Sequence, residues 1–269
     1  EGGVLLFTPD VSQYPTVLTR WEGMDCYNTS PMIYAYEQEN IAITGNGVLD
    51  GQASVENWWK WVIAKKVKEE NLQNTPNSIP RLMNYMTEGI PTEQRIFGDG
   101  SFLRPSFIQP YLCKNVLIEG ITIKRPPMWM LHPVLSENVT IRNVKLFSPS
   151  APNGDGCDPE ACKNVLIERC EFNTGDDCIA IKSGRNKDGY DRGIPTENVV
   201  IRFCKMLDGH GGITIGSETS GGVRNVYAYD CEMNSPHLDI ALRFKSNKYR
   251  GGIIENIFFR DIKIGEVGN

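Results

Sequence analysis

Apolar residues recur along the second half of this chain in one pattern of fixed spacing. An asparagine is followed by apolar residues one, three, six and eight places later, and successive copies begin 23 to 34 residues apart. Repeats of this length are typical of solenoids, in which each repeat forms one coil. Six copies carry the pattern: NVLIEGITI from Asn115, NVTIRNVKL from Asn138, NVLIERCEF from Asn164, NVVIRFCKM from Asn198, NVYAYDCEM from Asn225 and NIFFRDIKI from Asn256. A weaker copy, NIAITGNGV, begins at Asn40.

The spacing within a copy predicts two short strands joined by a bend. The apolar residues alternate as a strand requires, but the phase slips between the third and sixth offsets. Such a unit cannot bury its apolar face alone, so the coils must stack in parallel, about 4.8 Å apart, around a shared core. We therefore predict an all-β fold, a right-handed single-stranded parallel β-helix. The recurrent asparagine suits a turn in which side chains form a hydrogen-bonded ladder. Leucine-rich or helical repeats fit less well, because the copies are rich in Val and Ile and lack a 3.6-residue period.

One region departs from the repeat. We expect residues 1–269 to form a single β-helix domain, incomplete at one or both ends, with an inserted helix and loops at 54–111. Residues 54–71 predict a short amphipathic helix, and the proline-rich stretch 75–111 predicts long loops. Aromatic residues beside a solenoid suit sugar stacking, but tryptophans on a helix more often simply pack. The predicted helix carries three of them: Trp58, Trp59 and Trp61.

Three of the eight cysteines fall on the repeat. They stand six places after the asparagine, where other copies have Ile or Val, so we predict buried free thiols. A metal site made by this trio is disfavoured, because the neighbouring positions are aliphatic and no histidine joins them. Cys157 and Cys162 lie five apart in a loop and are candidates for a local disulfide. The three repeat cysteines are Cys170, Cys204 and Cys231.

Composition limits the partners. With 269 residues, 40% of them hydrophobic, the chain can fill a sizeable core, and we expect a monomer. Its net charge of −5 argues against a nucleic-acid or anionic-membrane surface, so any anionic substrate must meet a local positive site. No apolar run approaches the roughly 20 residues that span a bilayer, and the first residues lack the features of a signal peptide.

A third segment of successive coils gathers the polar chemistry. The segments DDCIAIKS from Asp176, HGGITIGS from His210 and DIALRFKS from Asp239 align with their final serines in register. This alignment places Asp176 beside His210, and matching Cys157 to Cys178 adds Asp155 at the same position on the preceding rung. The alternate positions then face outward, including Lys182, Arg243 and Lys245.

The result is a predicted surface groove with carboxylates at one end and cations at the other. Hydrolysis of a glycosidic bond needs one carboxylic acid and one carboxylate, about 6.5–9.5 Å apart when the configuration inverts. Residues one or two rungs apart can supply that spacing, and packed aspartates raise one another's pKa, which keeps one protonated. Ordinary Asp/Gly turns are the plainer interpretation of each motif taken alone, but their convergence on one face favours a site.

At these positions the chain resembles the polygalacturonase family of glycoside hydrolases, family 28, and its bacterial and plant exo-type members. Its four motifs appear in order, one coil apart, and the segment RWEGMDCYNTSPMIYA from Arg20 is also similar. The resemblance covers at least residues 115–269. The motifs are Asn153-Gly154-Asp155, Gly175-Asp176-Asp177, Gly209-His210-Gly211 and Arg243-Phe244-Lys245.

The resemblance implies a role for each position. Asp176 becomes the general acid, Asp155 and Asp177 position and activate water, and His210 supports the acid. Substrate binding falls to four further residues. These are Arg243, Lys245, Asn153 and Lys182, of which the first two are expected to hold the sugar carboxylate.

The family's chemistry gives the expected function: inverting hydrolysis of α-1,4-galacturonosyl linkages in pectin or polygalacturonate, with no cofactor and no metal. Many family members have Gln at the position of Gly175, whereas exo-acting members also have Gly there. Together with the long insertion, this glycine favours attack from chain ends. A polymeric substrate implies a secreted or periplasmic enzyme. The alternatives are a calcium-dependent pectate lyase, with an Arg or Lys base, and a non-catalytic sugar-binding or structural solenoid.

Overall fold

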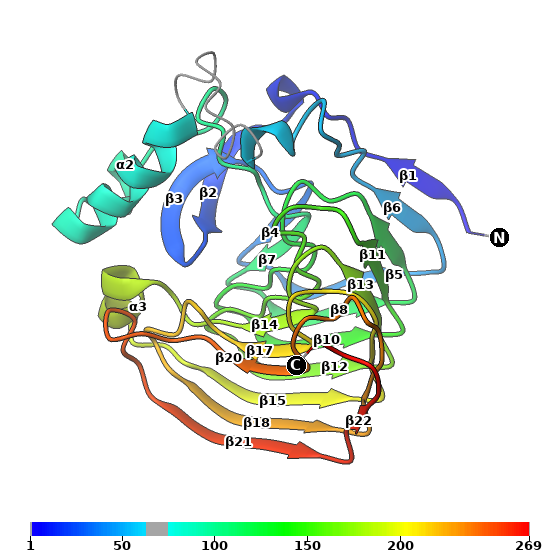
Figure 1. Ribbon diagram of the computed structural model, residues 1–269. Helices are drawn as coiled ribbons and strands as arrows, with labels where there is room; N and C mark the ends of the chain where they lie inside the picture. Colours follow the sequence, from blue (N-terminus) through cyan, green and yellow to red (C-terminus); the bar gives the residue numbers. More distant parts are fainter. Residues whose placement is uncertain (1, 63–74, 269) are drawn as a thin grey trace.

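The chain winds into a right-handed parallel β-helix, shown by a computed structural model that describes residues 2–62 and 75–268 (Figure 1). Each repeat copy forms two strands joined by a bend, as predicted. The first strands build the first sheet: β5 (Glu39–Thr44), β8 (Lys114–Glu119), β10 (Glu137–Arg142), β12 (Lys163–Glu168), β15 (Thr196–Arg202), β18 (Val223–Tyr229) and β21 (Ile254–Arg260).

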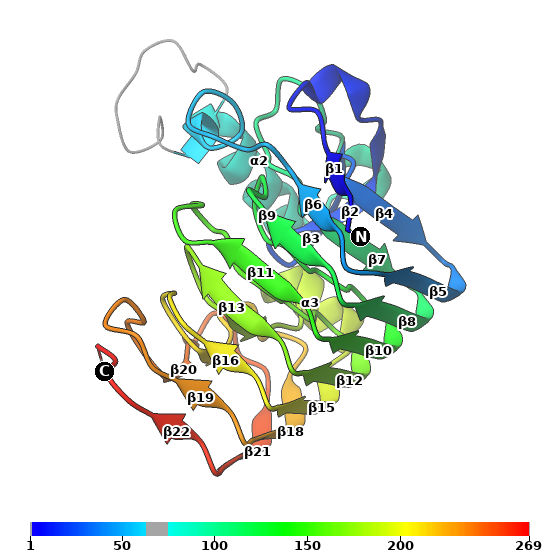
Figure 2. The ribbon, with the colours of Figure 1, turned by 90° about the vertical axis from the view of Figure 1, so that its right-hand side faces the viewer.

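The second strands of the copies stack beside the first sheet (Figure 2). They form the second sheet: β6 (Val48–Asp50), β9 (Thr122–Lys124), β11 (Lys145–Ser148), β13 (Glu171–Thr174), β16 (Lys205–Met206), β19 (Glu232–Met233) and β22 (Lys263–Ile264), with β1 (Val4–Leu6) added at the edge beside β6. The four apolar positions of a copy point inward, and in the copy at Asn138 all four are buried. Because every rung repeats this pattern, the core is continuous along the stack.

The repeat asparagines form the expected ladder. Each has a φ near +55°, the left-handed region that Asn tolerates better than most residues. Each side-chain amide donates to the asparagine oxygen of the preceding rung, from Asn115 on Asn40 at 2.9 Å to Asn256 on Asn225 at 3.1 Å. The ladder therefore satisfies the side-chain amides at a turn whose left-handed backbone a bulkier residue would adopt only with strain.

The cysteines are all free and buried. Cys170, Cys204 and Cys231 lie in the inward stack, which confirms the register of the repeat. The suggested disulfide between Cys157 and Cys162 is wrong. Both thiols lie in the core, and the Cys162 Sγ donates to the backbone oxygen of Pro133 instead.

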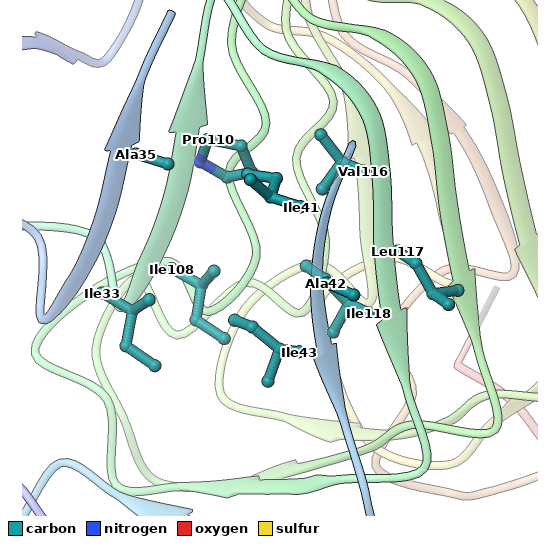
Figure 3. A pocket seen from close by; sticks show the side chains of 10 residues that line it. All are labelled: Ile33, Ala35, Ile41, Ala42, Ile43, Ile108, Pro110, Val116, Leu117 and Ile118. Carbon is teal, nitrogen blue, oxygen red and sulfur yellow. The ribbon is translucent and has the colours of Figure 1, made fainter. Parts of the chain in front are cut away.

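A third parallel sheet closes each coil. It comprises β14 (Ile179–Ile181), β17 (Ile213–Ile215) and β20 (Leu242–Phe244), and bridges through Cys157 and Leu131 continue it towards β7 (Ile108–Tyr111) and β4 (Ile33–Tyr36). An antiparallel hairpin, β2 (Thr16–Trp21) and β3 (Met24–Thr29), lies outside the coils. Where the stack reaches β4 and β5, inward apolar side chains such as Ile33, Ile43 and Ile118 line an open pocket (Figure 3).

Residues 75–111 are not simply loops, so that expectation was wrong. They include α2 (Thr75–Glu88) and the short η2 (Thr92–Gln94), and two further helical segments are η1 (Val11–Gln13) and α3 (Asn186–Arg192). The prolines concealed the apolar spacing of α2. Its buried Leu82 and Met86 pack against Trp21 and Met24 of the hairpin, which stabilises a helix that contains Pro80.

The predicted helix at 54–71 lies partly outside the described residues. Within the described part, Trp58 and Trp61 are buried and meet edge to face, with ring centroids 4.9 Å apart. The Trp59 indole donates to the Pro126 backbone oxygen at 2.9 Å. Packing is therefore the role that the structure shows for these tryptophans.

Among the residues that the structure describes, no helix is both long and apolar enough to cross a membrane.

We expect the thiols of Cys170, Cys204 and Cys231 to react slowly with a disulfide reagent in the native protein, because they are buried in the coil stack. The same thiols should react at once in urea. Time courses of labelling, with the modified peptides identified by mass spectrometry, measure both rates. Rapid native labelling of all three would contradict the register.

Candidate active site

The register of the third sheet decides which polar residues meet. Ile179 pairs with Ile213, and Cys157 pairs with Ile179 rather than with Cys178. Asp176 and His210 are therefore aligned as expected, but Asp155 aligns with Asp177 and not with Asp176. The predicted alignment was one residue off, because two cysteines were matched by type although they belong to different positions of the strand.

Three carboxylates nevertheless gather at the edge of this sheet. Asp155, Asp176 and Asp177 each bring one oxygen within 4.8 Å of the other two. Asp155 and Asp177 are buried, at 3% and 0% exposure, whereas the Asp176 side chain is 19% exposed. Asp176 is thus the member of the cluster that most directly faces solvent.

Glycines make this close approach possible. A Cβ on Gly175 would lie 2.2 Å from the Ala151 backbone oxygen, so no side chain fits at this position, directly before Asp176 in the chain. A Cβ on Gly211 would lie 2.7 Å from Asp177 Oδ1. Gly211 is on the rung between Asp177 and Arg243, and its missing side chain lets groups two rungs apart reach each other.

The two predicted cations both contact Asp177. The Lys245 ammonium donates to Asp177 Oδ2, and the Arg243 guanidinium lies 3.6 Å from Asp177 Oδ1. Their side chains keep 25% and 32% exposure, so each also presents a face to solvent. The cations therefore compensate a buried carboxylate and remain accessible at the surface above it.

His210 contacts one of the carboxylates, and Asn153 lies two residues before another in the chain. His210 Nδ1 lies 3.1 Å from Asp176 Oδ1, and the imidazole is about half exposed. Asn153 Oδ1 accepts a 2.7 Å hydrogen bond from Arg104, a buried residue that the sequence did not single out. Burial lowers the pKa of Arg104 to about 10, against the opposing charges of Glu22, Asp155 and Asp176. Arg104 comes from an irregular loop, so no repeat position identified it.

Lys182 is not exposed at the surface, as a substrate-binding residue was expected to be. It projects outward from the coil, as predicted, yet it is only 3% exposed and sits 4.6 Å above the Trp129 ring. Its ammonium is 3.2 Å from Glu218 Oε2 and 3.5 Å from Asp158 Oδ1. In the described part of the structure, Lys182 therefore contacts buried protein groups and does not form part of a surface open to substrate.

Sequence reasoning also missed Asp158 and Glu218. Asp158 faces outward beneath the carboxylate cluster, in the column that continues through Ala180, Thr214 and Arg243. Its alternation with the inward Cys157 was the available signal. Glu218 follows β17 in a loop with no repeat position. Burial alone would raise the pKa of Glu218, but Lys182 and Arg185 outweigh it and hold that pKa at about 2.

Burial is also the largest influence on the pKa values of the acids beneath the surface. It raises the pKa of Asp155 well above its usual range, and the charges of Asp158 and Asp176 add to the effect. It raises the pKa of Asp158 to about 8, although Lys182 opposes the shift. Below neutral pH this pair therefore holds a proton that ordinary carboxylates would lose.

The oxygens of Asp155, Asp176 and Asp177 are close enough to surround a water molecule or a cation. Lys245 and Arg243 already supply positive charge to Asp177, so Asp177 does not need a metal ion as its counter-charge.

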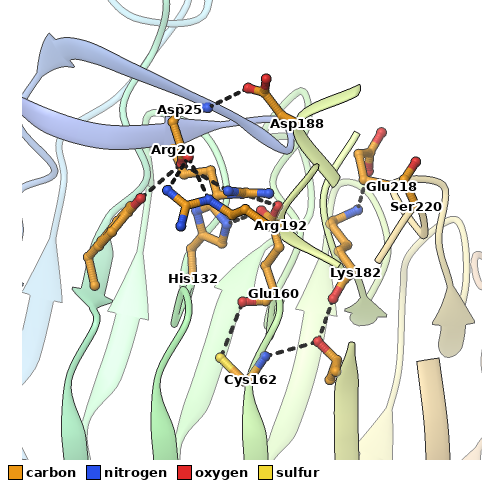
Figure 4. A network of polar contacts seen from close by, with 12 residues as sticks. Arg20, Asp25, His132, Glu160, Cys162, Lys182, Asp188, Arg192, Glu218 and Ser220 are labelled. Atoms are coloured by element: carbon orange, nitrogen blue, oxygen red, sulfur yellow. Dashed lines mark hydrogen bonds and ion pairs between the residues drawn. The ribbon is translucent and has the colours of Figure 1, made fainter. Parts of the chain in front are cut away.

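The hairpin covers the third sheet on the β4 and β7 side of this cluster, through a network of buried charges (Figure 4). Arg20 donates to Glu160 at 2.5 Å and to Asp25 at 2.9 Å, and His132 Nε2 lies 2.9 Å from Glu160. Burial would raise the pKa of Glu160, but Arg20 and His132 outweigh it and lower that pKa. Arg192 of α3 completes the network on Asp25.

The tip of the hairpin reaches the loops that follow β14 and β17. The Gly23 backbone oxygen accepts a 3.0 Å bond from the Arg185 amide, and Glu22 pairs with the Arg185 guanidinium at 2.7 Å. A Cβ on Gly23 would lie 2.7 Å from the Arg185 nitrogen and 3.1 Å from Glu218 Cγ. The tip therefore closes tightly onto one side of the site.

In this parallel β-helix, three clustered carboxylates thus lie beside two partly exposed cations. Residues 99–269 match the family model of glycosyl hydrolases family 28, and the chain belongs to that family.

Known relatives agree with this assignment. The chain superposes with a TM-score of 0.92 on the hyperthermoactive exopolygalacturonase from Thermotoga maritima, at 49% identity, covering 98% of this chain and 62% of that one. A probable polygalacturonase of Vitis vinifera is 30% identical over 96% of this chain and 46% of its own length. An exo-poly-alpha-D-galacturonosidase of Dickeya chrysanthemi is 25% identical over 97% and 45%. The chain spans about half the length of these curated relatives.

Replacing Glu160 by Gln should destabilise the protein by about 3–5 kcal/mol, because Arg20 then stays buried without its full counter-charge. Glu39→Gln is a matched control. It breaks an exposed 3.8 Å pair with Lys114, so it should cost about 0–1 kcal/mol. Urea unfolding of the three proteins measures the difference, and equal costs would contradict a structural role for the network.

Proposed function

We propose that this chain hydrolyses α-1,4-galacturonosyl linkages of pectin or polygalacturonate, acting from chain ends. The observation that carries the proposal is the meeting of three carboxylates, with oxygens within 4.8 Å, at the positions of the family motifs. A glycosidase needs such acids, and the two accessible cations beside Asp177 suit a substrate that carries a carboxylate on every sugar.

The geometry supports a division of roles among the acids. Asp176 is the most exposed carboxylate of the cluster and contacts His210, so we assign it as the general acid that protonates the leaving oxygen. Asp155 and Asp177 lie deeper and activate the attacking water. Asn153 is a proposed substrate ligand held by Arg104. Lys182 is too buried for the substrate contact first expected of it, and we propose a supporting role beneath the site.

The short spacing of the carboxylates bears on the stereochemistry of the proposed reaction. Oxygens within 4.8 Å are nearer to the separation of about 5–5.5 Å in retaining enzymes than to the 6.5–9.5 Å of inverting ones. A retaining nucleophile must itself touch the anomeric carbon. Asp155 and Asp177 are almost fully buried, and Lys245 occupies an oxygen of Asp177, so a water held between them is the better placed nucleophile. We therefore propose inversion.

Two observations favour attack at chain ends. The hairpin tip closes one side of the site through Glu22 and Gly23, which supports a pocket more than an open cleft. The relatives from Thermotoga maritima and Dickeya chrysanthemi are both named as exo-acting. Because pectic polymers do not enter cells intact, we also propose a secreted or periplasmic location, and a monomeric enzyme.

One assay separates this function from its rivals. With polygalacturonate, we expect reducing ends to appear without unsaturated product, and the rate to be unchanged by a chelator. A calcium-dependent pectate lyase would give unsaturated ends that absorb in the ultraviolet and would stop on chelation. A binding or structural protein would give neither product. Chain-end attack predicts monomers or short oligomers from the first minutes of digestion.

Asp176→Asn should reduce hydrolysis by at least about 100-fold, because the amide keeps the shape of the side chain but cannot donate the proton. Substrate binding and the urea midpoint should stay near the wild-type values. Steady-state kinetics and calorimetry test both, and a variant with more than about a hundredth of wild-type turnover would remove Asp176 from the role.

The first product of the wild-type enzyme should have the inverted anomeric configuration. Proton NMR of early digests distinguishes the two anomers before they equilibrate. A retained anomer would replace the water-attack scheme by a covalent one, which the short carboxylate spacing would then explain.

Lys245→Met should weaken binding of galacturonate oligomers by roughly 1.5–3 kcal/mol, the range for a hydrogen bond to a charged group. Binding of neutral galactose oligomers should hardly change. Lys248→Met is a control that removes the same charge from a nearby surface residue. Calorimetry in the Asp176→Asn background, where substrate is not consumed, measures all pairs. Equal losses for acidic and neutral sugars would exclude Lys245 from carboxylate recognition.

A further inference from the structure

Arg104 is a buried cation whose partners are all neutral. Its side chain comes from an irregular segment and is only 3% exposed. The guanidinium donates to the Pro127 backbone oxygen at 2.7 Å, and to the Pro152 backbone oxygen at 2.6 Å. It also donates to Asn153 Oδ1 at 2.7 Å. A buried cation without a paired acid costs stability, which points to a function for these bonds beyond folding.

The bonds of Arg104 hold the turn that leads to the carboxylate cluster. Asn153 has a φ of +52°, and the next amide, that of Gly154, donates to the Ala151 backbone oxygen at 2.9 Å. A Cβ on Gly154 would lie 2.6 Å from the Ala151 Cβ, so the turn is tight. Asp155 follows directly after it. Arg104 therefore contacts the turn at its most constrained point.

The contact with Arg104 also decides which way the Asn153 amide points. A guanidinium carries hydrogen-bond donors and no acceptor, so the atom that faces it must be Oδ1 of Asn153. The amide nitrogen, Nδ2, then lies on the other side. Within residues 2–62 and 75–268, Nδ2 donates to no other group, and it is not among the buried polar atoms that lack a partner. This NH₂ group is therefore open to solvent.

The hairpin fixes the segment from which Arg104 extends. The Trp21 indole donates to the Arg104 backbone oxygen at 3.0 Å, and the Asn28 side-chain amide donates to the Leu103 backbone oxygen at 2.9 Å. Trp21 and Asn28 are both buried. The position of the Asn153 amide thus depends on residues far from it in the chain.

We propose that Arg104 is a positioning residue for substrate binding: it fixes the Asn153 amide so that Nδ2 donates to a hydroxyl oxygen of the bound sugar. The inference rests on the proposed function and adds a residue to it. Arg243 and Lys245 are assigned to the sugar carboxylate, which leaves a hydroxyl for Asn153. An amide already held in one orientation loses little freedom when the sugar binds. Arg104 touches no sugar and acts through Asn153.

A double-mutant cycle tests whether Arg104 acts through Asn153. Arg104→Lys keeps the charge but replaces the planar fork by one ammonium, and Asn153→Ala removes the amide. Each should weaken binding of galacturonate oligomers about 10-fold, the effect of one lost hydrogen bond. The double variant should bind no more weakly than Asn153→Ala, because no amide is left to position. Calorimetry in the Asp176→Asn background measures all four proteins. Losses that multiply to about 100-fold would overturn the proposal.

Neutral sugars give a second test. Galactose oligomers carry the same ring hydroxyls, so Arg104→Lys and Asn153→Ala should weaken their binding by the same factor. This result differs from that expected of Lys245→Met, which affects only the acidic sugar. A loss confined to galacturonate would overturn the assignment to a hydroxyl. Arg142→Lys is the control for a replaced guanidinium. Arg142 pairs with Glu119 on the first sheet, and its substitution should leave both affinities unchanged.

Asn153→Asp separates positioning from folding and leaves Arg104 intact. The carboxylate keeps the shape of the side chain and still accepts from Arg104, so the urea midpoint should equal or exceed that of the wild type. A carboxylate offers no donor to a sugar, so binding of neutral galactose oligomers should fall about 10-fold. Neutral oligomers are the probe because the new charge would also repel galacturonate. Unchanged neutral binding would overturn the proposal.

A spectroscopic readout does not depend on turnover. In protein labelled with ¹⁵N at asparagine side chains, one NH₂ pair should be missing from Asn153→Ala. That pair should shift when galacturonate oligomers are added to the wild type, and its shift in the free protein should change in Arg104→Lys. If the pair responds to neither, the proposal fails whatever the activity. If it responds to both but the wild type does not hydrolyse polygalacturonate, the proposed function fails, and the positioning by Arg104 is still established.

Discussion

The structure depends on parallel hydrogen bonding between coils at one fixed register. A single coil exposes four apolar side chains and has no partner for its backbone, so it is stable only when stacked on others. Stacking fixes the side chain that each rung contributes to each face. The carboxylates, the histidine and the cations come from separate rungs, and only this register brings them together. The core and the site are therefore consequences of the same constraint.

The site places several acids in a space that water hardly reaches, and each is compensated differently. Asp177 is neutralised by Lys245 and Arg243, Glu218 by Lys182, and Glu160 by Arg20. Asp158 shares Lys182 with Glu218, and burial raises the pKa of both Asp155 and Asp158.

The hairpin adds what the solenoid alone lacks. A stack of similar coils presents an open groove along its whole length, whereas the hairpin covers the β4 and β7 side through Arg20 and closes on Arg185 at its tip. The polar groups that join the hairpin to the coils are nearly all buried, so these contacts fix the position of the hairpin. A fixed wall on this side of the site supports the attack at chain ends that we propose.

The sequence by itself determined the coil, its two strands with their bend, the asparagine ladder, the inward cysteines and the family. Each of these depends on local alternation and on a repeat that aligns by its own spacing, such as Asn138 over Asn115. It also brought the four family motifs to one face. Only the tertiary structure decided that Asp155 aligns with Asp177, because two cysteines of similar character left the register ambiguous by one residue. It alone showed that Lys182 is buried between Asp158 and Glu218, and that a proline-containing segment forms α2. Those features come from contacts between residues far apart in the chain, which follow no repeat in the sequence. They also depend on burial, which sets the charge of each group and which the pattern of residues along the sequence does not show.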